Sequence, residues 1–109
     1  MLIMQTQSKL PDISTIRESA AMVCRMLKVL ANEDRLLILC QLSQGNKNVG
    51  ELKELLGMQQ PTLSQQLTVL REERLVTTER KGKYIVYSLA SKEVTEIMGT
   101  LFQLYCKNH

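Results

Sequence analysis

Aromatic residues and histidine are scarce in this chain. Its 109 residues include no Trp, one Phe and three Tyr, and the only histidine is His109 at the end of the sequence. Nucleophilic catalysis needs a nucleophile, a base and a third group that orients the base, and many phosphate-binding enzymes carry a glycine-rich loop. Neither pattern is found in the sequence. We therefore expect a protein that is not an enzyme and uses no cofactor.

Long apolar runs are also missing. The N-terminal apolar run, residues 1–4, is too short for a signal peptide or a membrane span. We therefore expect a cytoplasmic protein without a membrane partner, in which residues 1–11 form a flexible arm. Residues 12–109 contain no repeat or low-complexity tract, and we expect them to form one small domain.

What the chain does contain is a helix with one apolar and one polar face. Leu63, Leu67 and Leu70 repeat at i, i+4 and i+7 behind Pro61, a residue that suits the first turn of a helix. No acidic residue appears on the polar face before Glu72. Amides can read base edges in the major groove, and hydroxyls can bind bases or phosphates. The residues of this helix that are predicted to bind DNA are Gln59, Gln60, Thr62, Ser64, Gln65, Gln66 and Arg71.

A shorter helix is predicted just before it. Asn48 can cap its N-terminus with Glu51 as the capping-box partner, and Gly57 follows its end. Its buried face is expected to comprise Leu52, Leu55 and Leu56. Only a short turn that begins at Gly57 separates the two helices, which is typical of a helix-turn-helix.

A β-hairpin with a basic tip is predicted after the second of these helices. Residues 75–78 and 84–89 are rich in β-prone side chains, and Lys81-Gly82 can form the turn between them. The hairpin residues predicted to contact DNA are Arg80, Lys81 and Lys83. A basic hairpin tip alone is usually a solvated turn. Its position directly behind an amide-rich helix favours a wing that contacts DNA.

Two more helices carry apolar seams at alternating steps of three and four residues. The first, capped by Asp12 or Ser14, contains Ile13, Ile16, Ala20, Val23, Leu27 and Leu30; the last, capped by Ser91, contains Val94, Ile97, Met98, Leu101, Leu104 and Tyr105. This is more apolar surface than one small core needs. We therefore expect both helices to form a symmetric homodimer interface that presents two recognition helices to a pseudo-palindromic site.

A further helix is predicted between residues 32 and 44. Asn32 can cap it, and the apolar run 36–42 should be buried on most sides. The predicted order is thus four helices, a β-hairpin and a fifth helix. This order is the mainly α (α+β) winged helix-turn-helix fold.

Three segments resemble the ArsR/SmtB family of winged-helix repressors: residues 30–39 (LANEDRLLIL), 49–52 (VGEL) and 60–67 (QPTLSQQL). The resemblance extends over roughly residues 20–106. It is closest to the subgroup of the biofilm growth-associated repressor and its sulfide-responsive and HlyU-like relatives. The resemblance implies a homodimeric bacterial transcriptional repressor that binds double-stranded operator DNA and leaves it when an inducer arrives.

The three cysteines bear on which inducer that is. Cys24, Cys40 and Cys106 match neither a zinc ribbon nor a C-x-x-C motif. Metal-sensing members of the resembled family place cysteines in the helix that here spans residues 49–56, or histidines in the last helix, and this chain has neither. We therefore expect no metal site.

In the sulfur-sensing subgroup, two cysteines lie at positions that Cys40 and Cys106 match. The resemblance implies a sensing dithiol that is reduced on DNA. Persulfides, polysulfides or an oxidant would link the two sulfurs and release the DNA.

Other interpretations remain open for the cysteines and for the fold. A free cysteine is often a small buried hydrophobe, and this role is favoured for Cys24, beside the seam of the first helix. Spacing alone would favour it for Cys40 and Cys106 too. A sensor of trivalent arsenic or another soft metal could use the same thiols. A winged-helix module can also bind protein in place of DNA.

Overall fold

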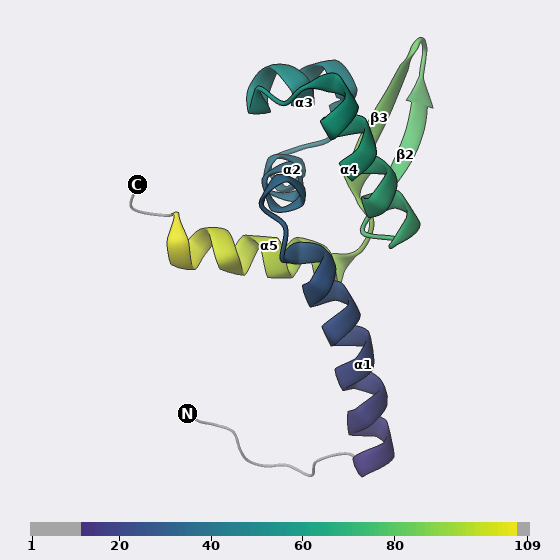
Figure 1. The fold of residues 1–109 in the computed structure, drawn as a ribbon, viewed down its shortest axis with the longest axis vertical. Helices are drawn as coiled ribbons and strands as arrows, with labels where there is room; N and C mark the ends of the chain where they lie inside the picture. The colour runs from purple at the N-terminus through teal and green to yellow at the C-terminus, as the bar shows by residue number, and fades with distance from the viewer. Residues whose placement is uncertain (1–11, 107–109) are drawn as a thin grey trace.

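The helices and strands follow the predicted order. The computed structural model describes residues 12–106 (Figure 1). Its elements are α1 (Ile13–Leu30), α2 (Glu33–Ser43), β1 (Lys47–Asn48), α3 (Val49–Leu56), α4 (Gln60–Glu72), β2 (Val76–Lys81), β3 (Tyr84–Leu89) and α5 (Lys92–Tyr105). The predicted arm, residues 1–11, lies outside the described residues. The winged helix-turn-helix prediction is confirmed, with one short strand added.

Side-chain caps set the starts of four helices. Asp12, Asn32, Asn48 and Ser91 each accept a hydrogen bond from a backbone N–H of the first turn that follows. At α3 the capping box is complete, because the Glu51 carboxylate also accepts from the Asn48 backbone N–H at 2.8 Å. Gly57, in the left-handed conformation at φ +67°, ends α3. These boundaries follow from local sequence, as predicted.

The sheet has three strands, in the order β1-β3-β2. The extra strand, β1, is only two residues long and pairs antiparallel with β3 through Tyr87 and Val86. The hairpin turn also lies one residue later than predicted. Lys81 pairs with Tyr84, so Gly82 and Lys83 form a two-residue loop, and Gly82 takes a positive φ of +63° at its first position.

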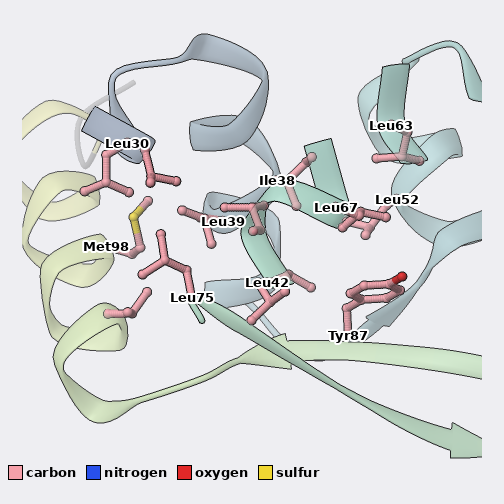
Figure 2. Packing of buried hydrophobic residues seen from close by; sticks show 14 residues of the cluster. Leu30, Ile38, Leu39, Leu42, Leu52, Leu63, Leu67, Leu75, Tyr87 and Met98 are labelled. Atoms are coloured by element: carbon pink, nitrogen blue, oxygen red, sulfur yellow. The ribbon is translucent and has the colours of Figure 1, made fainter. Parts of the chain in front are cut away.

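The core is built around α2. Ile38, Leu39 and Leu42 project from α2 among side chains of the other helices and of the sheet (Figure 2). The predicted stripe of α4 is confirmed, since Leu63, Leu67 and Leu70 are buried. The remaining buried residues are Val29, Leu30, Leu52, Leu75, Val76, Tyr87, Val94 and Met98. α2 contacts α1, α3, α4, α5 and β3, so it fixes their relative positions.

One core prediction is wrong at a single position. Leu55 on α3 is 55% exposed, because α3 packs against the core through Val49, Leu52 and Leu56. The run 36–42 is buried or half-buried at every position except Leu37, which is 42% exposed, so its predicted burial on most sides is confirmed.

Most of α1 extends away from the rest of the molecule (Figure 1). The Cα radius of gyration is 16.4 Å, larger than the value of about 13 Å expected for a compact chain of this length. Of the predicted seam of α1, only Leu30 is buried, whereas Leu27 is 53% exposed. On α5, Val94 and Met98 are buried and Leu104 and Tyr105 are exposed. A single copy therefore leaves apolar side chains of both helices in contact with solvent.

Within residues 12–106, no helix combines the length and the apolar character that a membrane crossing requires.

Candidate DNA-reading face and thiol pocket

The polar face of α4 is open to solvent. Gln59, Gln60, Ser64, Gln65 and Arg71 are exposed, and Thr62 and Gln66 are half-buried. The buried leucine stripe on the opposite side holds this face outward. The seven predicted residues thus lie along one helix and its N-cap. Their side chains differ in how far they are hydrogen-bonded to other residues of the chain.

Local hydrogen bonds distinguish these side chains. The Gln60 Nε2 amide donates to Ser64 Oγ at 3.3 Å. The half-buried Gln66 accepts at Oε1 from the guanidinium of Arg35 on α2, at 3.0 Å. Gln65 has no such side-chain partner among the described residues. Its amide therefore keeps both a donor and an acceptor for an external partner.

The N-terminus of α4 differs from the other helix starts. Gln59 occupies the N-cap position but its side chain makes no capping hydrogen bond, and Pro61 lies in the first turn. Uncapped N–H groups at the positive end of a helix attract anions such as phosphate. The start of α4 thus suits an approach to a DNA backbone.

The β2–β3 hairpin projects beside α4 (Figure 1). Arg80, Lys81 and Lys83 are all exposed near its tip, together with one acidic residue, Glu79. Lys83 Nζ lies 5.6 Å from the centre of the Tyr84 ring. An ideal Cβ placed on Gly82 would meet open space. The tip is therefore a protruding basic loop, which suits contact with phosphates.

Cys40 and Cys106 come together although they lie 66 positions apart in the sequence. Cys40 lies near the end of α2, and Cys106 is the C-cap of α5. Both line one cavity of about 270 Å³. The other lining residues are Leu36, Met98, Leu101, Phe102 and Tyr105. The fold therefore places both thiols at a small pocket of mainly apolar and aromatic side chains, between α2 and α5.

The two thiols differ in their surroundings. Both are free, with Cys40 half-buried and Cys106 exposed. Burial raises the pKa of the Cys40 thiol, and repulsion from the Cys106 thiolate raises it further. At neutral pH the Cys40 thiol is therefore mostly protonated and weakly nucleophilic.

Cys24 does not share this pocket. It lies on the solvent-facing part of α1, so its predicted role as a buried core residue is wrong within one chain. Among residues 12–106, no three His, Cys, Asp or Glu side chains are grouped as metal ligands. The three cysteines of one chain thus do not form a common ligand set.

Sequence reasoning missed Arg35, which joins α2 to α4 through Gln66. The one sequence signal for Arg35 was its position within segment 30–39, which resembles the family. The shared thiol pocket was implied by the resemblance alone, because no local pattern connects residues so far apart in the chain.

Comparison with known proteins identifies the family. Residues 32–78, from the N-cap of α2 into β2, match the family model described as bacterial regulatory protein, arsR family. The biofilm growth-associated repressor of Agrobacterium fabrum is 42% identical over 94 residues, which cover 86% of this chain and 80% of that protein. The transcriptional activator HlyU of Vibrio cholerae is 38% identical, over 88% of this chain and 89% of that protein.

Solved structures agree. The structure of reduced HlyU from Vibrio cholerae superposes with a TM-score of 0.83, at 38% identity, and covers 87% of this chain and all (100%) of that one. A DNA-binding domain from Mycobacterium bovis, described as a homodimeric winged helix-turn-helix, superposes with a TM-score of 0.73 at 27% identity, over 94% of this chain and 93% of that one. On the match of sequence, fold and element order, the chain belongs to the arsR family of bacterial regulatory proteins and is not an enzyme.

Proposed function

We propose that the chain is a homodimeric transcriptional repressor of the bacterial cytoplasm. In this proposal its reduced form binds double-stranded operator DNA through α4 and the β2–β3 hairpin. Reactive sulfur species or an oxidant then link Cys40 to Cys106 and release the DNA. The observation that carries the sensing part is the shared pocket of the two thiols. The relatives include both a named repressor and a named activator, and repression is chosen because the first of these is the more similar in sequence.

The DNA-binding part rests on the polar face of α4 and the basic hairpin. Net charge is only +3, so the placement of the charges matters more than their sum. Gln65 can pair with a base edge through both ends of its amide, and the three basic residues of the hairpin can bind phosphates. Base contacts would supply specificity and the wing would supply affinity that depends on salt.

The dimer part rests on the exposed apolar residues of α1 and α5. Soluble proteins rarely leave large contiguous apolar patches uncovered. The exposed residues of α1 that are apolar include Ile13, Ile16, Met22, Val23 and Leu27, and those of α5 are Phe102, Leu104 and Tyr105. The homodimeric state of the Mycobacterium bovis domain also supports a dimer. A two-fold axis would then place two α4 helices about one DNA turn, roughly 34–36 Å, apart.

The dimer predicts a mass of twice the 12.4 kDa of one chain in sedimentation at micromolar concentration. Leu27→Asp on α1 should shift the mass toward the monomer, because it buries a charge in the interface. Leu55→Asp on α3 is the matched control, since Leu55 is 55% and Leu27 is 53% exposed in one chain. A monomeric wild type, or dissociation by both variants alike, would contradict this interface.

For DNA binding, Gln65→Ala should weaken operator binding by about 1–3 kcal/mol and relax discrimination at one base pair. Lys81→Ala should weaken binding to all duplexes alike and lower the salt slope by about 1. Fluorescence anisotropy on DNA from upstream of the gene, at several salt concentrations, measures both effects. Failure of the folded dimer to bind any duplex at low salt would favour a protein-binding module.

The linking reaction can be balanced with a persulfide as the oxidant. One cysteine thiolate attacks the outer, sulfane sulfur of glutathione persulfide, which releases glutathione. The second thiolate then attacks the resulting protein persulfide and displaces hydrogen sulfide. The sum converts two thiols and one persulfide to one disulfide, one glutathione and one hydrogen sulfide. Further persulfide would insert extra sulfur atoms between the cysteines. In a reducing cytosol such a link is transient, as regulation requires.

The link would act through α2, which contacts both α4 and α5. A covalent bond between Cys40 and Cys106 ties the end of α5 to α2. Because α5 is part of the proposed dimer interface, the bond would change the orientation of α4 and the β2–β3 hairpin of each chain relative to that interface. A small rotation of each unit changes the separation of the two α4 helices, and binding to fixed half-sites weakens.

The rate of linking should rise with pH. Since its surroundings raise the pKa of Cys40, the thiolate fraction at neutral pH is small, and it grows about tenfold for each pH unit below that pKa. Intact-mass spectrometry after glutathione persulfide treatment should show the loss of two hydrogens, or added sulfur, at a rate that increases from pH 7 to 9. Cys24→Ser should react alike and Cys40→Ser should not form the link. A link that involves Cys24, or a rate independent of pH, would contradict the proposed pair.

A further inference from the structure

Arg35 joins three helices through one guanidinium. It lies half-buried in the first turn of α2. Its Nε donates to the backbone carbonyl of Val29, at the end of α1, at 2.8 Å. Its Nη1 donates to Gln66 Oε1 on α4, at 3.0 Å. The planar guanidinium has enough donors, in fixed directions, to serve both acceptors together.

The position of Arg35 is unfavourable for α2 itself. It is the third residue after the N-cap Asn32, where a capping box would have Glu or Gln, and a cation near the positive end of a helix is disfavoured. Val29 compensates for this, because its carbonyl belongs to the last turn of α1, where carbonyls lack partners and carry partial negative charge. A residue that breaks a local rule for a tertiary contact marks a position with a further role.

The contact also restricts what Gln66 can do. A guanidinium only donates, so it must face the amide oxygen of Gln66, and the NH₂ group points elsewhere. Reading adenine through both ends of an amide needs that oxygen. Gln65, one residue away, has both ends available. The two neighbouring glutamines therefore have different tasks.

We propose that Arg35 is a positioning residue for DNA binding, which fixes the recognition helix α4 to the end of α1 through Gln66. This inference rests on the proposed function. α1 carries apolar residues of the proposed dimer interface. By holding α4 to the end of α1, the guanidinium would fix the orientation of α4 relative to the dimer axis. In this arrangement Gln66 anchors α4 and Gln65 reads a base.

The test is a double-mutant cycle on operator binding by the full-length dimer, measured by fluorescence anisotropy. Gln66→Met removes one hydrogen bond to a charged group and should weaken binding about tenfold. Arg35→Met also removes the hydrogen bond to the Val29 carbonyl and should weaken binding at least as much. The double variant should bind no more weakly than the weaker single variant, because both changes break the same contact. In the matched cycle of Arg35→Met with Gln65→Ala, the two effects should multiply.

Further readouts separate positioning from other roles. Arg35→Lys keeps the positive charge but lacks the planar guanidinium that reaches both acceptors, so this variant should bind DNA as weakly as Arg35→Met. If Arg35→Lys bound with wild-type affinity, the charge alone would suffice and the proposal would be overturned. The proposal would also be overturned if the losses of DNA affinity caused by Arg35→Met and Gln66→Met multiplied in the double variant. If Arg35→Met does not fold, Gln66→Met alone decides: a similar loss on all single-base operator variants supports anchoring, and a loss confined to one base pair opposes it. A wild type that binds no duplex would instead refute the proposed function.

Discussion

The burial of α2 is the constraint on which the rest of this structure depends. Ile38, Leu39 and Leu42 fill the centre of the core, and each such side chain contributes about 1.5–3 kcal/mol when removed from water. Because α1, α3, α4, α5 and β3 all pack on this one helix, none of them can change position without a change at α2. The recognition helix and the thiol pocket are thus attached to the same short element, with Cys40 directly after Leu39.

In the proposed function, this arrangement would connect sensing to DNA binding without a long pathway. Cys40 and Arg35 lie on α2 only five positions apart. One lines the pocket shared with α5, and the other holds Gln66 of α4 and the end of α1. The proposed covalent link at the pocket and the hydrogen bonds of Arg35 would therefore act on neighbouring turns of one helix. Packed interfaces between helices tend to move between discrete arrangements, so a small local change would affect the whole proposed dimer.

Much of the fold could be predicted because its signals are local. The caps Asp12, Asn32 and Asn48, the leucine stripe of α4 and the glycine after α3 act within a few residues of where they stand. Features that depend on distant partners could not be predicted. β1 is a strand only because β3 lies beside it, and Leu55 is exposed only because α3 packs through other residues. The proximity of Cys40 and Cys106 was expected only from the family resemblance. The contact of Arg35 with Gln66 joins residues 31 positions apart, and no local pattern indicates it.

We propose that a link between Cys40 and Cys106 releases DNA. The most direct measurement is anisotropy of operator DNA with the reduced dimer, before and after treatment with glutathione persulfide, for the wild type, Cys40→Ser and Cys24→Ser. We expect the wild type and Cys24→Ser to release the DNA and Cys40→Ser to stay bound. Binding should recover when a thiol reductant is added. Tight binding by the wild type after the link has formed would contradict this proposal and would leave a DNA-binding dimer whose inducer acts elsewhere.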